Sequence, residues 1–192
     1  MPTQRLFGGV GIRICQSMRT SLLLLAISLV HPLAASAAPT KPPASAPDNG
    51  ARKSIGTFDD WQAAINVEAG QTVCYAFTRG KSASRKLPGR GDVVLTVTQR
   101  GAARDAVALN AGFTYAANAA VVVQIDKLTL DFYTAQRYAF ARDGAAMIAA
   151  LQKVSTMTAK SPVAKAADVV DNFSLKGFKQ AYDAINKACP VK

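Results

Sequence analysis

Histidine and glutamate are almost absent from this sequence. The chain has one histidine, His31, and one glutamate, Glu68. Histidine is the usual general base at neutral pH, the usual partner of a Ser or Cys nucleophile and the commonest metal ligand. Because His31 precedes the region predicted to fold, Ser-His-Asp and Cys-His arrangements and ordinary zinc sites are excluded from that region. The sequence therefore predicts no catalytic residue, no metal site and no cofactor.

Aspartates supply nearly all the carboxyl groups. Glycosidase-type catalysis needs a pair of carboxyl groups. Asp59, Asp60, Asp126 and Asp131 are available, but the adjacent Asp59 and Asp60 are more simply a turn before a strand. An aspartate-based hydrolase, or an inhibitor-like module, is therefore the alternative function. It requires a concave pocket that holds two of Asp126, Asp131, Asp143 and Asp171 within hydrogen-bonding reach of each other.

No hydrophobic run in the sequence has the length of a membrane span. The apolar stretch Leu22–Val30 is well below the ~20 residues that a spanning helix needs. Arginines precede it and the small residues "AASAAP" follow it, which is the order of a cleavable signal peptide. We expect residues 1–37 to be removed by cleavage after Ala37, with Ala38 as the neighbouring option and Met18 as an alternative start. This predicts a periplasmic or secreted protein with no transmembrane segment after cleavage.

The rest of the chain is predicted to be one basic domain behind a short spacer. Residues 38–54 are rich in Pro, Ala and Ser and lack large apolar side chains, which is typical of a disordered spacer. Residues 55–192 have the length of a single domain with a real core. The chain has a net charge of +11, and only three of its 23 basic residues and none of its 12 acidic residues lie in the signal peptide. The exported domain therefore stays strongly basic.

Short strand signals dominate the domain. Six segments are enriched in β-branched and aromatic residues, and they cover 61–68, 71–79, 92–100, 106–115, 120–126 and 128–134. Ala69-Gly70 and Asp126-Lys127 are placed as turns between neighbouring strands. This spacing predicts a mainly β fold, an antiparallel β-sandwich or barrel-like domain.

Two helices are expected late in the chain. Asp143 is a good N-cap for a short helix over residues 144–153. A second helix is predicted to begin after Ser174 as its N-cap and to stop at Pro190. Residues spaced three and four apart give this helix one apolar stripe, formed by Leu175, Phe178, Tyr182, Ile185 and Cys189. We therefore expect a C-terminal amphipathic helix that packs on the β domain.

Two cysteines remain after export, because Cys15 lies in the signal peptide. Alternation along 71–79 places Cys74 on a face of small side chains such as Ala76, against which another element can pack closely. Cys189 ends the apolar stripe of the last helix. In an oxidising compartment this favours a disulfide between Cys74 and Cys189. Two buried free thiols, or a bond between chains, are the alternatives.

Four short motifs follow the signal peptide in a fixed order: "GTFDDW", "VCY", "VVVQID" and "FSLKGFKQAYDAI". In this order the sequence resembles the invasion-associated locus B family of exported proteobacterial proteins, over about residues 55–189. In that family a cysteine usually stands a few residues after the tryptophan. Here "QAAINVE" follows Trp61, so the chain resembles a divergent member. The resemblance implies a β-sandwich-like envelope protein with no known enzymatic activity. The role in invasion from which the family takes its name is not assigned to this chain, because no residue of the sequence encodes it.

Basic residues crowd the connection after residue 79. We identify five as candidate contacts to an anion, namely Arg79, Lys81, Arg85, Lys86 and Arg90. As a hairpin loop they would face lipid headgroups, lipopolysaccharide or acidic polysaccharide, and the alternative is a solvated loop that keeps the protein soluble. Export and the lack of aromatic residues in this loop argue against nucleic acid. The aromatic residues are expected in the core, namely Trp61, Tyr75, Phe77, Phe113, Phe178 and Tyr182. The predicted function is an exported, non-catalytic envelope protein that binds a partner, either a protein or an anionic envelope component.

Overall fold

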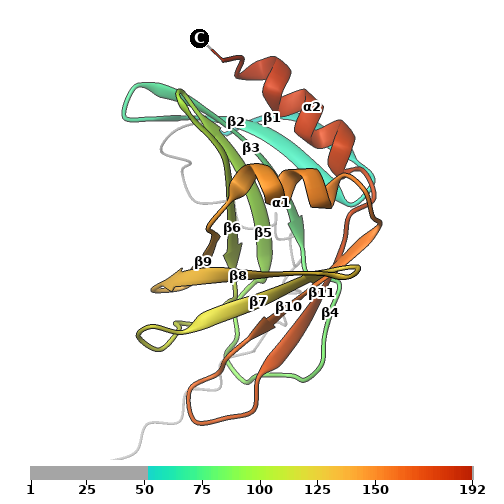
Figure 1. The fold of residues 1–192 in the computed structure, drawn as a ribbon. Helices are drawn as coiled ribbons and strands as arrows, with labels where there is room; N and C mark the ends of the chain where they lie inside the picture. The colour runs from blue at the N-terminus through green and yellow to red at the C-terminus, as the bar shows by residue number, and fades with distance from the viewer. Residues whose placement is uncertain (1–51, 192) are drawn as a thin grey trace, which may run out of the picture. The chain divides into compact units, whose positions relative to one another are not determined.

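The structure is a computed structural model that describes residues 52–191. In this part of the chain, eleven strands form one antiparallel sheet (Figure 1). In sequence order the strands are Lys53–Phe58 (β1), Trp61–Glu68 (β2), Gln71–Arg79 (β3), Ser82–Ala83 (β4), Val94–Arg100 (β5), Ala103–Asn110 (β6), Ala120–Ile125 (β7), Leu128–Ala135 (β8), Tyr138–Ala141 (β9), Thr156–Ser161 (β10) and Val169–Ser174 (β11). The helices are Gly144–Leu151 (α1) and Phe178–Ala188 (α2).

The sheet curls so that β4, the last strand in its spatial order, lies close to β3, the third strand in that order. The spatial order is β1-β2-β3-β5-β6-β9-β8-β7-β10-β11-β4. Only Gly80 and Lys81 separate β3 from β4, and the amide of Lys81 donates to the carbonyl of Asn172 in β11 at 2.8 Å. The sheet therefore returns on itself, with the β1–β2 hairpin as an extension. This confirms the predicted mainly β, antiparallel and barrel-like fold.

Residues with positive φ form the tight turns of the sheet. Ala69 (φ 48°) and Gly70 (φ 78°) join β2 to β3, as predicted, and both central residues have the positive φ that a type I′ hairpin turn requires. Asp126 (φ 52°) turns the chain between β7 and β8. Asp is one of the few residues other than glycine that tolerate this region. Both predicted turns are present.

The strand predicted over residues 106–115 is wrong at both ends, since β6 runs from Ala103 to Asn110. Gly112 has a φ of 78°, and a Cβ there would lie 2.3 Å from the carbonyl oxygen of Gly91. The chain therefore leaves the sheet where two backbone segments meet. β1 begins at Lys53, inside the expected spacer, whose residues 38–51 lie outside the described part of the chain.

The first helix agrees with the sequence prediction and the second begins later than predicted. Asp143 caps α1 by accepting a hydrogen bond from the amide of Ala146 at 2.9 Å. Ser174 is not the N-cap of α2, because it is the last residue of β11 and pairs with Thr156 of β10. The cap is Gly177, whose φ is 83° and whose Cα approaches the carbonyl of Phe58. The pairing of β11 with β10 therefore determines the conformation of Ser174, although serine is a good N-cap residue.

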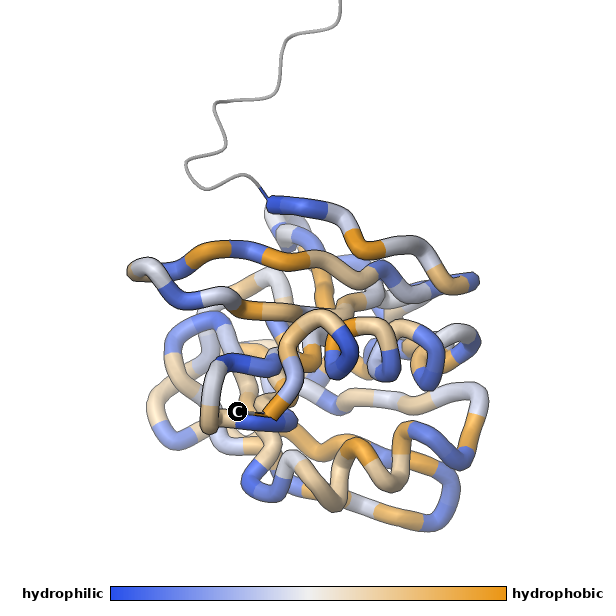
Figure 2. The backbone as a smooth tube through the Cα atoms, turned by 90° about the horizontal axis from the view of Figure 1, so that it is seen from above, coloured by the Kyte–Doolittle hydropathy of each residue, from blue (hydrophilic) through white to orange (hydrophobic). Residues whose placement is uncertain are grey.

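The core lies between the inner face of the sheet and the two helices. α2 packs on β1, β2 and β3, and α1 packs on β6. Trp61 is fully buried, its Nε1 donates to the carbonyl of Ser174 at 3.1 Å, and its ring lies 4.8 Å from that of Phe178. Figure 2 shows hydrophobic and hydrophilic segments alternating along the strands. The alternation is clear in β7, where Val121, Val123 and Ile125 are buried and the residues between them are exposed.

Candidate functional site

The disulfide joins α2 to the middle of the sheet. Cys74 and Cys189 are bonded, with their Cα atoms 6.0 Å apart. Cys74 is fully buried on the inner face of β3 beside Ala76, which is also fully buried. These small side chains let the helix approach the strand closely. The crosslink therefore fixes one end of α2 on the sheet.

The connection that follows β3 joins the antiparallel strands β3 and β5, as the predicted hairpin loop does, but part of it is attached to the sheet. Residues 81–84 pair with β11 through β4, and the amide of Gly80 donates to the carbonyl of Val93 at 2.9 Å. Arg79 forms an ion pair with Asp92, and Lys81 forms one with Asp60. The hydrogen bond from Lys81 lowers the pKa of the Asp60 carboxyl below its ordinary value.

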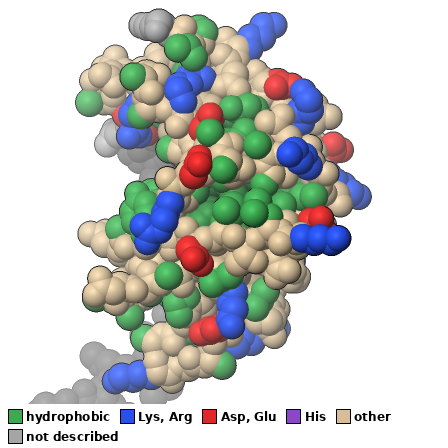
Figure 3. Space-filling view, in the orientation of Figure 1, with side chains coloured by type: hydrophobic (Ala, Val, Ile, Leu, Met, Phe, Trp, Pro, Cys, Tyr) green, Lys and Arg blue, Asp and Glu red, His purple; other side chains and the backbone are tan. Residues whose placement is uncertain are grey.

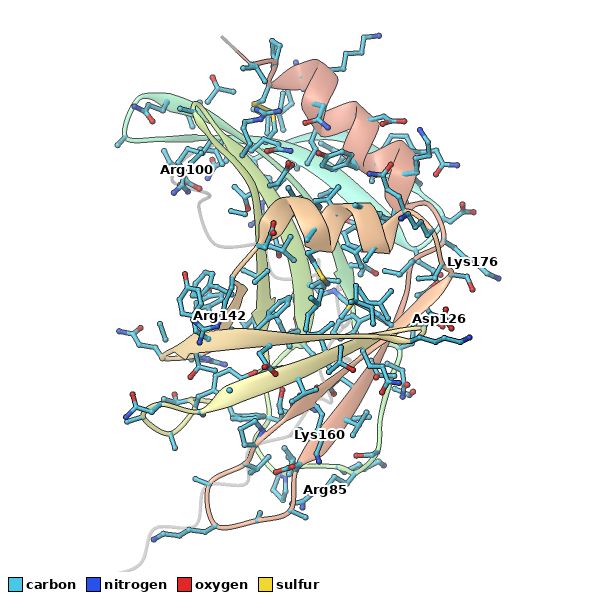
Figure 4. The ribbon with its side chains drawn as sticks, viewed as in Figure 1. Arg85, Arg100, Asp126, Arg142, Lys160 and Lys176 are labelled. Carbon is cyan, nitrogen blue, oxygen red and sulfur yellow. A yellow bond between two sulfur atoms is a disulfide. The ribbon has the colours of Figure 1, made fainter. Side chains whose placement is uncertain are left out.

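The remaining basic residues of this connection lie in different surroundings. Arg85 donates to the carbonyl of Ala167 at 2.9 Å, and Lys86 is exposed. Arg90 turns inward: its guanidinium makes two hydrogen bonds to the carboxylate of Asp171, at 2.8 and 2.6 Å. Arg90 is one of the five predicted anion contacts, but its charge is balanced by Asp171 inside the domain. Figure 4 shows Arg85 at the lower end of the domain, in the region of Lys160.

A groove of about 550 Å³ lies on the outer face of β3, β5, β6 and β9. Strand pairing sets its floor, because Phe77 lies opposite Thr96, Thr96 opposite Ala108, and Ala108 opposite Phe140. One row across four strands thus runs from an aromatic ring over two small side chains to a second ring. The two neighbouring rows add Thr98 and Asn110 to the lining. The floor is therefore low and partly polar, between aromatic walls.

Two pairs of rings form these walls. On β3 the rings of Tyr75 and Phe77 lie 6.0 Å apart, and on β9 those of Tyr138 and Phe140 also lie 6.0 Å apart. Tyr138 is 45% exposed and the other three are half-buried. The expectation that Tyr75 and Phe77 lie in the core is therefore wrong. The small residues of β3 face inward to admit α2, so its aromatic residues face outward.

Charged pairs stand at both ends of the groove. Arg79 with Asp92 lies at one end, and Arg100 with Glu68 lies at the other. The guanidinium of Arg52 lies 5.4 Å from the centre of the Tyr75 ring. Three arginines and one glutamate belong to the lining itself, and Arg79 and Arg100 are paired with Asp92 and Glu68. In Figure 4 Arg100 and Arg142 lie on the left of the domain, away from Arg85 and Lys160.

The groove was not predicted from the sequence, and the four aspartates considered for catalysis do not line it. Asp171 pairs with Arg90, Asp143 caps α1, Asp126 lies in a turn and Asp131 lies opposite Val122 in the β7–β8 pair. Among residues 52–191 there is no group of three or more His, Cys, Asp or Glu side chains placed to hold a metal ion. In the same range, no helix combines the length and the apolar character of a membrane span.

On the face seen in Figure 3, hydrophobic side chains gather around α1, and Lys and Arg side chains are scattered towards the periphery. The exposed hydrophobic residues there are small, since α1 presents Ala145, Ala146 and Ala149 to solvent. The groove, in contrast, has aromatic walls and charged pairs at both of its ends. The groove is therefore the candidate functional site.

These features define a disulfide-linked, barrel-like β protein with a basic, aromatic-walled groove on its outer face. Residues 61–186 match the family described as Invasion associated locus B (IalB) protein, and the chain belongs to this family. This confirms the resemblance seen in the sequence motifs. Among solved structures, invasion associated protein b from Bartonella henselae is similar, with a TM-score of 0.51 and 16% identity. The match covers 69% of this chain and 95% of that chain, and it shows the fold alone. A search of curated proteins finds no match.

Proposed function

We propose that this protein is an exported, non-catalytic envelope protein that binds an anionic partner in the groove. Membership of the invasion-associated locus B family supports export. The disulfide is consistent with an oxidising compartment, the periplasm or the exterior. The groove carries the binding part of the proposal, because arginines at both of its ends flank half-exposed rings.

The proposal includes the leader and the spacer, which lie almost wholly outside the described residues. Residues 1–37 are the signal peptide, with Met18 as an alternative start. The spacer predicted over residues 38–54 ends before Lys53, where β1 of the domain begins. Mass spectrometry of the periplasmic protein should find an N-terminus at Ala38 or Pro39. Recovery of an intact leader in the membrane fraction would contradict export by cleavage.

The cationic residues divide into two sets in this proposal. Arg79 belongs both to the predicted anion contacts and to the groove, where it acts with Arg100. Arg85 and Lys86 form a second basic surface that adds long-range attraction to an anionic envelope component, whereas Lys81 is paired with Asp60. Arg90 belongs to the fold, since its charge is balanced by Asp171.

The absence of catalysis rests on the residues that remain after export. The domain has no histidine, and the aspartates perform separate structural tasks or lie in a turn or on a strand. A general acid and base acting together need two titratable groups close to one substrate atom. The groove lining holds one carboxyl group, that of Glu68, which is paired with Arg100. The other lining residues are mainly arginines, aromatic residues, threonines and asparagines.

The test measures binding of residues 38–192 to lipopolysaccharide, to anionic lipid vesicles and to acidic polysaccharide, at low and at physiological ionic strength. Binding to at least one of them should weaken with added salt. The variant Arg79→Gln/Arg100→Gln should lose this binding, and Lys160→Gln, which removes a charge from an exposed pair with Asp168, should keep it. The loss of affinity in the variant Arg85→Gln/Lys86→Gln measures how much the second basic surface contributes to binding. A wild-type protein that binds none of the three at low ionic strength would overturn the proposal.

A further inference from the structure

We propose that the partner held in the groove is an acidic oligosaccharide, which lies along β5 and β6 between the two aromatic walls. This rests on the proposed function and names the chemical class of its ligand. The inference follows from the size of the groove, from the chemistry of its floor and walls and from the place of its charges.

The dimensions follow from strand geometry. The walls stand on β3 and β9, which are three inter-strand steps apart, so their backbones are roughly 14 Å apart. Along β3, Val73 lies opposite Arg100, and Arg79 stands six positions after Val73. The two charged ends are therefore roughly 20 Å apart along the strands. This is a trough for a short extended chain, not a pocket for one small molecule.

The walls suit sugar rings. A pyranose ring has an apolar face of C–H groups, which packs against the negative face of an aromatic ring. Each wall offers such rings at half exposure, and Phe140 is held in place by the ring of Tyr133 at 5.4 Å. Arg142 lies over the outer side of Tyr133, 5.6 Å from its centre. The wall on β9 is thus supported by its neighbours before any ligand arrives, which lowers the entropic cost of binding.

The floor suits hydroxyl groups. Thr96, Thr98 and Asn110 present side chains that donate and accept hydrogen bonds. Their spacing across β5 and β6 distributes these groups along the trough. A neutral sugar chain would already find partners here. The arginines add the preference for acid, because a guanidinium binds a carboxylate through two parallel hydrogen bonds.

Other anionic partners fit the groove less well. An extended peptide gains most of its affinity by pairing with an exposed strand edge. β5 has no free edge, because it pairs with β3 on one side and with β6 on the other. A lipid acyl chain needs an apolar channel, whereas threonine and asparagine form part of this floor. A ligand that brings its own hydroxyl and carboxylate groups matches the side chains that are present.

The experiment uses residues 38–192 with the disulfide intact and two probes of equal length. One probe is an oligogalacturonate hexasaccharide, and the other is the same hexasaccharide with its carboxyl groups methyl-esterified. Calorimetry should show binding of the acid, and esterification should weaken it about tenfold or more. Equal binding of acid and ester would overturn the preference for acidic sugars.

Two variants test the walls and the ends. Tyr138→Ala removes a half-exposed ring and should weaken binding of both probes about tenfold. Arg100→Gln should weaken binding of the acid alone. Leu128→Ala, which truncates a side chain 43% exposed in the β7–β8 hairpin, is the matched control and should bind as wild type. Unchanged far-ultraviolet circular dichroism shows that each variant is folded. Acid binding that survives Tyr138→Ala unchanged would overturn the placement in the groove.

Anionic phosphatidylglycerol vesicles and lipopolysaccharide separate this inference from the proposed function. If either binds and the Arg79→Gln/Arg100→Gln variant does not bind it, while no hexasaccharide binds, the saccharide inference fails and the proposed function stands. If neither hexasaccharide nor any anionic envelope material binds, both fail.

Discussion

Arg90 and Asp171 are 81 residues apart in the sequence and form a buried, two-pronged ion pair. The side chain of Asp171 is 2% exposed and that of Arg90 is 9% exposed. The Arg90 Nε also donates to the carbonyl of Ala111 at 2.7 Å, so this one side chain connects β11 to the segment after β6. The pair therefore organises the end of the barrel at which the connection after β3 returns to the sheet.

Removal of Arg90 should be strongly destabilising. Arg90→Ala leaves the Asp171 carboxylate buried without a partner, and loss of one member of a buried pair costs about 3–5 kcal/mol. Urea unfolding of the purified domain measures this loss. Arg79→Ala is the matched control, because Arg79 and Asp92 form an exposed pair, for which a loss of about 0–1 kcal/mol is expected. Equal losses in the two variants would contradict the structural role of Arg90.

The disulfide should stabilise the domain through the unfolded state. Cys74 and Cys189 close a loop with a sequence separation of 115, and loss of such a bond lowers the free energy of unfolding by about 2–5 kcal/mol. Cys189→Ser should show this loss in urea unfolding, together with faster amide exchange in α2. The β signal in circular dichroism should persist, since the strand ladders do not include the bond. Two free thiols in the native periplasmic protein would contradict this assignment.

Gly177 should tolerate no side chain. A Cβ there would lie 1.9 Å from the carbonyl oxygen of Phe58, in a backbone conformation with φ of 83°. Gly70 has a similar φ of 78° but no heavy atom within 4 Å of such a Cβ. Gly70→Ala therefore carries only the backbone strain, about 1–2 kcal/mol, and Gly177→Ala adds a steric clash. Thermal unfolding should show a clearly larger loss for Gly177→Ala, and similar losses would exclude the close approach.

Tyr115 should make the domain sensitive to alkali. Burial raises the pKa of its phenol from 10.0 to about 12, although Ser161 Oγ lies within hydrogen-bonding distance of the hydroxyl. The unfolded chain loses this proton above pH 10, while the folded chain retains it. The stabilisation is thus complete below pH 10 and is lost as the pH rises through 12. Urea unfolding across this range should show a steep decline for wild type and a shallower one for Tyr115→Phe. Parallel declines would contradict the burial of the phenol.

Local patterns in the sequence account for the central part of the fold. Alternation along β3 correctly placed Cys74 inward on a face of small residues, and turn chemistry located Ala69-Gly70. β11 was missed because Asp171 interrupts its apolar pattern, and a buried aspartate is tolerated there only through Arg90. β9 has only four residues, which is too short for a periodic signal.

The groove could not be predicted for a different reason. Alternation shows which residues of a strand share a face, but both faces of β3 are apolar enough to be buried. The choice depends on α2, which needs the small face, and therefore Tyr75 and Phe77 face outward. The opposite wall comes from β9, more than 60 residues later, and reaches β3 only through the order β3-β5-β6-β9. A non-local sheet order of this kind leaves no local signal in the sequence.

The most direct test of the groove as the binding surface is a titration of isotope-labelled residues 38–192 with the acidic hexasaccharide, followed by amide chemical shifts. We expect the largest shifts on the two walls and the floor, at Phe77, Thr96, Ala108 and Phe140, because these residues form one row across the groove. Shifts that gather instead at residues 84–88, around Arg85 and Lys86, would contradict this account and place the contact on the connection after β3.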